Sequence, residues 1–260
     1  MLRRRHAEGF FGGRRFDTRE IGVAFREKRL YNGFKSAEGR HNTEEQLMEG
    51  TRFDQVYETM PWHKVDTVVF DIGNILICFA PQDFLVRLFP GDEDKQRAML
   101  EQVYCGPYWP EFDRGTIEYE DAARRLCAQF GGAYEDYMHA ITGWIELKEP
   151  IEEGWRAAER CRRAGKRLLL LSNYHRAAYA RLREKFANRF ALFDGGCISC
   201  DCHFNKPEPE IYETLIKTFD LEPGRTLFID DTLKNVEGAM RAGIHGFHMD
   251  EKGRMDRFFI

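Results

Sequence analysis

Six polar residues stand after short apolar runs or beside a proline, in four separate parts of this chain. They are Asp71, Ser172, Asn173, Lys206, Asp230 and Asp231. Carboxylates at the end of a buried segment are costly unless they bind a partner. Three of the six are carboxylates, and converging carboxylates repel one another unless a cation joins them. Their chemistry therefore depends on whether the fold brings them together.

Metal-assisted phosphoryl transfer is the chemistry that this set of residues supports. A few hard oxygen ligands suit Mg²⁺, whose coordination is usually completed by water and substrate phosphate. Lys206, the Ser172 hydroxyl and backbone N–H groups are the donors that a phosphate group needs. A carboxylate beside a metal and a phosphate, here Asp71, is a known type of covalent nucleophile. Each residue alone could be a surface lysine, a loop start or a helix cap, so the prediction depends on their combination.

Five short apolar runs predict the strands that position these residues. Continuous apolar runs of this length are typical of parallel strands buried on both faces. Helical patterns separate most of them, which predicts an α/β fold with a doubly wound, Rossmann-like parallel sheet. Ligands of such sheets bind beyond the carboxyl ends of the strands, so the six polar residues are expected to meet at one edge. The runs cover residues 65–72, 166–173, 195–199, 225–231 and 245–249.

Two parts of the chain depart from this alternation. Residues 80–149 show helical patterns and no clear strand, which predicts a helical insertion between core segments 60–79 and 150–260. Residues 1–41 contain 11 Lys and Arg against 5 Asp and Glu and lack a steady apolar period. We therefore expect residues 1–59 to form a loosely ordered N-terminal extension.

The composition limits the classes of partner. The net charge of −4 across 260 residues gives no overall footprint for nucleic acid. No apolar run approaches the roughly 18 residues of a membrane helix, and no secretory signal is apparent. Seven cysteines, an odd number, argue against a disulfide framework and for a cytoplasmic location. A zinc site at Cys197, Cys200, Cys202 and His203 is disfavoured, because a second ligand pair at zinc-finger spacing is missing.

Four motifs in this chain resemble those of the haloacid dehalogenase-like (HAD) superfamily of hydrolases. FDIGN is similar to its first motif, LLLLSN to the second, NKPEPEIYE to the third and LFIDDTLKNVEGA to the fourth. The likeness covers about residues 65–250, and the long interval between Asp71 and Ser172 leaves room for a helical cap at 80–149. Within the superfamily, the chain most resembles phosphatases with an FDxGN first motif, some of which act on sugar phosphates such as glucose 1-phosphate.

The resemblance implies a magnesium site. Asp71 would be both the nucleophile and a Mg²⁺ ligand. The carbonyl oxygen of Gly73 would be a second ligand, and Asp231 a third. Asp230 and Asn235 would orient the metal-bound waters and the catalytic lysine.

The resemblance also implies a phosphate site. Ser172 and the backbone of Asn173 would hold phosphate oxygens. Lys206 would offset the charge on Asp71 and on the transferring phosphoryl group. Gly73 departs from the pattern, because most phosphatases of this superfamily carry there an aspartate that protonates the leaving oxygen.

The function implied is Mg²⁺-dependent hydrolysis of a small phosphorylated metabolite, a sugar phosphate being favoured, through an aspartyl-phosphate intermediate. One alternative is a metal-independent 2-haloacid dehalogenase-type hydrolase. Another is a binding protein that keeps the scaffold but has weakened catalysis, as Gly73 suggests. If activity survives, the enzyme should favour leaving groups that need little protonation, or borrow a proton from the cap or from water. The sequence does not indicate an oligomeric state.

Residues near the motifs are candidates for substrate contacts. In the cap, Tyr108, Trp109, Glu111 and Asp113 could face the active site, or the aromatic side chains could pack in the cap's own core. After the second motif, His175 could donate a proton or simply begin a helix. Its neighbour Arg176 could bind an anionic group or remain a solvated helix charge.

Overall fold

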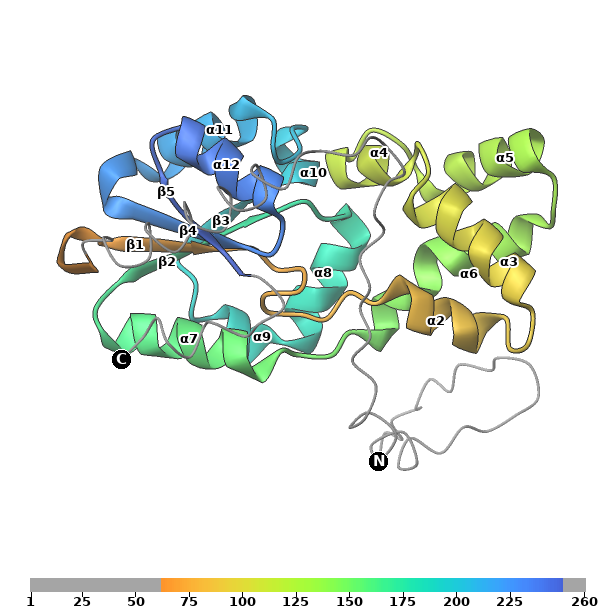
Figure 1. Ribbon diagram of the computed structural model, residues 1–260, viewed down its shortest axis with the longest axis horizontal. Coiled ribbons are helices and arrows are strands. Elements are labelled where there is room, and N and C mark those ends of the chain that lie inside the picture. Colours follow the sequence, from red (N-terminus) through yellow and green to blue (C-terminus); the bar gives the residue numbers. More distant parts are fainter. Residues whose placement is uncertain (1–61, 250–260) are drawn as a thin grey trace, which may run out of the picture. The chain divides into compact units, whose positions relative to one another are not determined.

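A computed structural model describes residues 62–249 of the chain. The extension predicted at 1–59 lies outside the described residues. Within them, five parallel strands form one sheet in the order β3-β2-β1-β4-β5, with helices on both faces (Figure 1). This is the doubly wound α/β arrangement that the alternating apolar runs and helical patterns predict.

All five strands fall where the apolar runs predict them. The first strand lies at the centre, and its Phe70 pairs in register with Leu170 on one side and Ile229 on the other. The run at 195–199 stops being a strand at Ile198, after which a short helix begins. The strands are β1 (Thr67–Phe70), β2 (Arg167–Ser172), β3 (Gly195–Ile198), β4 (Thr226–Asp230) and β5 (His245–His248).

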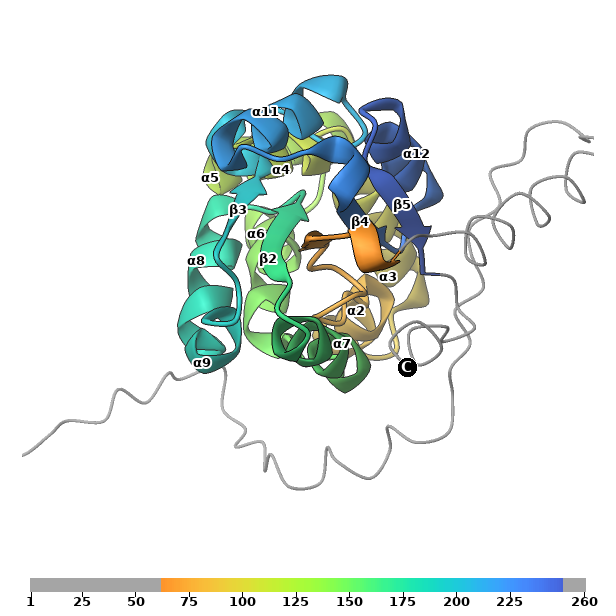
Figure 2. The same ribbon diagram turned by 90° about the vertical axis from the view of Figure 1, so that its left-hand side faces the viewer.

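Successive residues of each strand face two separate hydrophobic cores. Val68 and Phe70 of β1 belong to one core and Val69 to the other, because side chains alternate across a sheet. Both cores are covered by helices, so the strands are buried on both faces (Figure 2). The covering helices are α7 (Glu152–Arg163), α8 (Arg176–Lys185) and α9 (Ala187–Phe190) on one face, and α11 (Pro209–Phe219) and α12 (Leu233–Arg241) on the other.

Residues 81–147 are helical throughout their regular structure, as expected, and form a group beside the sheet (Figure 1). The division into core and cap domains stays a prediction. None of the helices within residues 62–249 is long and apolar enough to cross a membrane. The helices of this group are α2 (Pro81–Leu88), α3 (Glu93–Met99), the π-helix η4 (Leu100–Tyr104), α4 (Trp109–Arg114), α5 (Tyr119–Phe130), α6 (Tyr134–Thr142) and the 3₁₀ helix η5 (Gly143–Leu147).

Three short helices complete the described structure. Two of them precede strands: a 3₁₀ turn leads into β1 and another into β4. The third follows β3 and begins the loop that carries Lys206. They are η3 (Trp62–Lys64), η6 (Pro223–Arg225) and α10 (Ser199–Cys202).

Candidate active site

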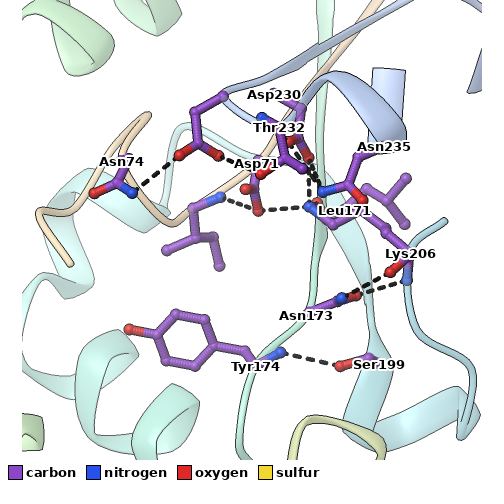
Figure 3. A network of polar contacts seen from close by, with 12 residues as sticks. Asp71, Asn74, Leu171, Asn173, Tyr174, Ser199, Lys206, Asp230, Thr232 and Asn235 are labelled. Carbon is purple, nitrogen blue, oxygen red and sulfur yellow. Dashed lines mark hydrogen bonds and ion pairs between the residues drawn. The ribbon is translucent and has the colours of Figure 1, made fainter. Parts of the chain in front are cut away.

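The carboxyl ends of the central strands bring the predicted polar residues together. Asp71 directly follows β1, Ser172 ends β2, and Asp230 ends β4 with Asp231 next to it. Lys206 enters from the loop between α10 and α11, and Figure 3 shows its side chain directed toward Asp71 and Asp230. Asp71, Asp230 and Asp231 each offer a carboxylate oxygen, and these oxygens lie within 4.8 Å of one another. The sheet topology thus assembles the site from segments that are far apart in the sequence.

Lys206 is a buried cation between two of the carboxylates. Its Nζ atom lies 2.8 Å from Oδ1 of Asp71 and 2.6 Å from Oδ2 of Asp230, and it donates a hydrogen bond of 3.1 Å to the carbonyl of Leu171. Its side chain is only 1% exposed. Burial opposes the charge, but the attraction of Asp230 and Asp71 outweighs it and raises the pKa of Lys206. The ammonium group is therefore held charged beside Asp71.

The side chain of Asn173 fixes the backbone on which Lys206 stands. Its Oδ1 accepts a hydrogen bond of 2.8 Å from the Lys206 N–H group, and its Nδ2 donates one of 3.1 Å to the Lys206 carbonyl (Figure 3). The sequence analysis gave a role only to the backbone of Asn173, which would hold a phosphate oxygen. The role of the Asn173 side chain could not be predicted from the sequence, because it bonds to a loop 33 residues away and no local pattern indicates that contact. The neighbouring Ser172 side chain is buried at the end of β2.

Both oxygens of Asp230 are engaged by protein donors. Besides Lys206, Oδ1 accepts a hydrogen bond of 2.7 Å from the N–H group of Thr232. The amide of Asn235 donates to both carboxylate oxygens, at 3.0 and 3.1 Å. Asp230 is fully buried, so these bonds compensate for its lost hydration. This geometry suits a residue that orients its neighbours.

Asp231 is held by a residue to which the sequence analysis gave no role. The Nδ2 atom of Asn74 donates a hydrogen bond of 2.9 Å to Oδ2 of Asp231, while its Oδ1 accepts one of 3.0 Å from the N–H group of Phe79. Asn74 has a φ angle of 50°, a left-handed conformation that asparagine adopts more readily than most residues. The first motif is thereby tied directly to the fourth.

The three aspartates have the character of a cation site. Burial raises the pKa of Asp71, and repulsion from Asp230 and Asp231 adds to the effect while Lys206 opposes it. Burial and the Asp230 charge likewise raise the pKa of Asp231. One lysine therefore does not neutralise the cluster, and a divalent cation would favour its ionised form. Because every donor is a carboxylate oxygen, the residues fit Mg²⁺.

Asp113 is the residue of the 108–113 segment whose carboxyl comes near this centre. It belongs to α4, and its side chain is 14% exposed. Burial raises its pKa to about 8; Lys206 opposes this shift, and the Asp71 charge adds to it. The carboxyl of Asp113 therefore lies within electrostatic reach of both residues. Its Oδ1 atom lies 3.4 Å from Nε2 of His175.

The aromatic residues of this segment pack between the helical insertion and the sheet. The ring of Trp109 lies 4.4 Å from His175 and 5.5 Å from Trp144, measured between centroids. Phe112 is buried, with its centroid 5.0 Å from His175. These rings therefore contact a residue of the core as well as the insertion's own helices. The sequence left two roles open for them, facing the active site or packing in the cap's own core. Packing within the cap alone does not describe their contact with His175.

His175 and Arg176 take the more ordinary of their predicted roles. His175 precedes α8 as its N-cap residue. Burial lowers its pKa to about 3, so its imidazole is neutral near pH 7 and is not a cationic acid. Arg176 forms an exposed ion pair with Asp201, 2.6 Å between Nη1 and Oδ1.

Cys197, Cys200 and Cys202 do not belong to the group of potential metal ligands that the structure forms within residues 62–249. The Sγ atoms of Cys197 and Cys202 are 3.7 Å apart, whereas Sγ of Cys200 lies near Asp201. Within residues 62–249, the three aspartates are the one group of three or more potential metal ligands. All seven cysteines are free thiols.

Comparison with known proteins shows that most of the described chain is similar to one family of hydrolases. A family model described as haloacid dehalogenase-like hydrolase matches residues 65–243. The sesquiterpene phosphatase AstK of Aspergillus oryzae is 26% identical over 183 residues, which is 70% of this chain and 89% of that protein. The drimenol cyclase DrtB of Aspergillus calidoustus is 20% identical over 196 residues, which is 74% of this chain but 35% of that protein.

Solved structures with this fold include enzymes of two chemistries. A HAD family enzyme from Bacteroides thetaiotaomicron, in complex with magnesium and inorganic phosphate, has a TM-score of 0.53 at 18% identity and covers 71% of this chain and 93% of its own. The L-2-haloacid dehalogenase from Xanthobacter autotrophicus, with chloropropionic acid covalently bound, has a TM-score of 0.52 at 20% identity and covers 71% and 77%. At these identities, the likeness shows the fold.

Proposed function

The chain belongs to the haloacid dehalogenase-like hydrolases, and we propose that it is a Mg²⁺-dependent phosphatase acting on a small phosphate monoester. The observation that carries this proposal is the placement of Lys206 between Asp71 and Asp230, with Asp231 alongside. One buried cation among three carboxylates leaves an excess of negative charge that suits a metal ion. A small phosphorylated metabolite as partner and a cytoplasmic location, both expected from the sequence, are part of the proposal.

Each residue of the site has a defined task in this reaction. A carboxylate oxygen of Asp71 attacks phosphorus, and the bond from phosphorus to the ester oxygen breaks, which gives an aspartyl phosphate. Lys206 offsets charge on Asp71 and on the phosphoryl oxygens. The Ser172 hydroxyl and the Asn173 N–H group hold phosphate oxygens. Water then cleaves the intermediate and releases inorganic phosphate.

The magnesium ligands in this proposal are Asp71, the carbonyl oxygen of Gly73 and Asp231. When bound, Mg²⁺ stabilises negative charge on the phosphoryl oxygens. Asp230 and Asn235 act indirectly, because the oxygens of Asp230 are engaged by Lys206, Thr232 and Asn235. They hold the lysine and the metal site in place.

The substrate alcohol could belong to either of two classes. The sequence favoured a sugar phosphate, in which aromatic rings stack on the sugar. The structure places Phe79, Trp109, Trp144 and Tyr174 in one connected group of rings, and a relative is named a sesquiterpene phosphatase. Rings in such a group could equally contact an apolar alcohol. A terpenoid monophosphate is therefore the second candidate.

A substrate panel with matched controls tests the proposal. Phosphate release is measured with Mg²⁺ for glucose 1-phosphate, farnesyl monophosphate, phenyl phosphate and a simple alkyl phosphate. We expect turnover that is lost with a chelator and restored by Mg²⁺. Halide release from 2-chloropropionate without metal would instead identify a dehalogenase-type hydrolase. Saturable binding of a phosphate ester without turnover would identify a binding protein.

A further inference from the structure

Two residues after the nucleophile Asp71, the chain has no side chain that could donate a proton. Gly73 offers no side chain, although a Cβ atom built there meets nothing within 4 Å. An alkoxide is a poor leaving group, so cleavage of an alkyl phosphate needs a proton on the departing oxygen. A group elsewhere in the protein must supply it if such esters are substrates.

Asp113 approaches the centre from the helical insertion. Its carboxyl is mostly buried and lies within electrostatic reach of Asp71 and Lys206. These two residues mark where the phosphoryl group binds. Asp71 directly follows β1 and Lys206 stands in the loop between α10 and α11, whereas Asp113 belongs to α4 of the helical insertion. A carboxyl of the insertion therefore lies within electrostatic reach of the two core residues that would bind the phosphoryl group.

Several bonds fasten α4 to the core around Asp113. The Ser199 hydroxyl donates a hydrogen bond of 2.5 Å to the Asp113 carbonyl. Next to it, Arg114 forms a two-pronged ion pair with Glu208, at 2.8 and 2.5 Å. The amide of Asn205, adjacent to Lys206, donates a bond of 2.8 Å to the Pro110 carbonyl. Asp113 is thus positioned by the loop that carries Lys206.

The surroundings of Asp113 favour its protonated form. His175 contributes a neutral imidazole at 3.4 Å. Its Nε2 atom is buried and makes no hydrogen bond within the described residues. Burial raises the pKa of Asp113 to about 8, so the carboxyl carries a proton near pH 7. The titratable groups that face it are His175, Tyr119, Tyr174, Lys206 and Asp71.

We propose that Asp113 protonates the leaving oxygen, in place of the aspartate that is absent at Gly73. The inference rests on the proposed phosphatase function. As an oxygen of Asp71 bonds to phosphorus, the ester P–O bond breaks and the Asp113 proton moves to the departing oxygen, which gives a neutral alcohol. The Asp113 carboxylate then takes a proton from the water that attacks the aspartyl phosphate. This returns the acid to its starting form, and one water is consumed per ester cleaved.

The test compares leaving groups in the Asp113→Asn variant. Asparagine keeps the size of the side chain but donates no acidic proton. We expect turnover of the alkyl phosphate to fall by about 100-fold or more. Turnover of 4-nitrophenyl phosphate, whose leaving group needs no proton, should fall only a few-fold. Glu118→Gln, at an exposed residue of the same insertion, is the matched control and should leave both rates unchanged.

A second variant makes the result independent of damage to the fold. Gly73→Asp restores a carboxyl beside the nucleophile, where the structure has room. Added to Asp113→Asn, it should restore alkyl phosphate turnover by at least tenfold. An equal loss on both esters in Asp113→Asn, with no restoration by Gly73→Asp, overturns the inference. If the wild type cleaves neither ester, the proposed phosphatase function itself fails.

Spectroscopy gives a readout that does not depend on turnover. The infrared difference between wild type and Asp113→Asn at pH 7 should show the carbonyl band of a protonated carboxylic acid. In activity profiles, the wild-type rate on the alkyl phosphate should fall as pH rises through about 8, because the acid form is lost. Asp113→Asn should lack this fall. An ionised carboxylate band at pH 7 contradicts the assignment.

Discussion

The side-chain amide of Asn74 donates a hydrogen bond of 2.9 Å to Oδ2 of Asp231. The two residues belong to loops after β1 and β4, strands that lie side by side at the centre of the sheet. Asn74 also accepts a hydrogen bond from the N–H group of Phe79, so its amide has one orientation that satisfies both partners. Asp231 is therefore fixed before any metal binds.

Replacing Asn74 with glycine should weaken Mg²⁺ binding. Glycine tolerates the φ angle of 50° at this position, so the change removes the amide with little backbone strain. Loss of a partner that orients a metal ligand typically costs about 10–100-fold in metal affinity. We expect that shift in the Mg²⁺ dependence of activity and in calorimetric titration, with turnover largely recovered at saturating Mg²⁺. An unchanged Mg²⁺ affinity would show that Asp231 needs no such support.

Asp71→Asn should abolish turnover on every phosphate ester while leaving the protein folded. The amide is a poor nucleophile, and it lacks the charge that Lys206 and the metal attract. Phosphate release and circular dichroism measure the two effects. The control is Thr214→Ala in α11, at a partly exposed residue whose hydroxyl donates a hydrogen bond to the Glu210 carbonyl of the same helix. Wild-type turnover in Asp71→Asn would refute the assigned nucleophile.

Lys206→Met should destabilise the fold as well as remove activity. It leaves Asp71 and Asp230 as uncompensated buried charges, and breaking a buried pair in this way costs about 3–5 kcal/mol. Urea unfolding in the absence of metal measures the free energy. The control is Lys217→Met, since Lys217 has a 77% exposed side chain on α11; its change should stay within about 0.5 kcal/mol. Similar losses in both variants would contradict the buried pair's role.

The strands and the convergence of the site were predictable because they follow from local patterns. Short apolar runs specify buried parallel strands, and the carboxyl ends of parallel strands share one edge. Asp71 and Asp230 could therefore be placed beside each other. The hydrogen bonds from Asn74 to Asp231 and between Asn173 and Lys206 join residues that are far apart in the sequence. Their geometry depends on how loops dock, which no local pattern records.

The role of Asp113 illustrates the same limit. Its acidic and aromatic surroundings marked it as a candidate, together with three neighbours. Choosing among them required the docking of α4 against the core through Ser199 and Glu208. Likewise, the sequence allowed His175 as a proton donor, whereas the structure buries it against aromatic rings, and this burial lowers its pKa. Burial reverses its expected chemistry, because a desolvated imidazole loses its proton.

Lys148 should make the stability of the protein rise with pH above neutrality. Its side chain is buried, and Nζ lies 3.7 Å from the centroid of the Trp144 ring. Burial lowers its pKa from 10.5 to about 7. Between these two values the unfolded chain binds the proton that the folded protein has lost. Stability therefore increases with pH across that window, by up to about 1.4 kcal/mol per pH unit from this group.

Urea unfolding of wild type and Lys148→Met at pH 7, 8 and 9 measures this effect. Methionine fills a similar volume among the rings without a charge to bury. The variant should be the more stable protein at pH 7, and its advantage should shrink as pH rises. On folding, the wild type releases the Lys148 proton that the unfolded chain keeps, and this release costs less free energy as pH rises toward 10.5. A difference between the two proteins that stays constant from pH 7 to 9 would mean that the Lys148 ammonium is as well solvated in the fold as in the unfolded chain.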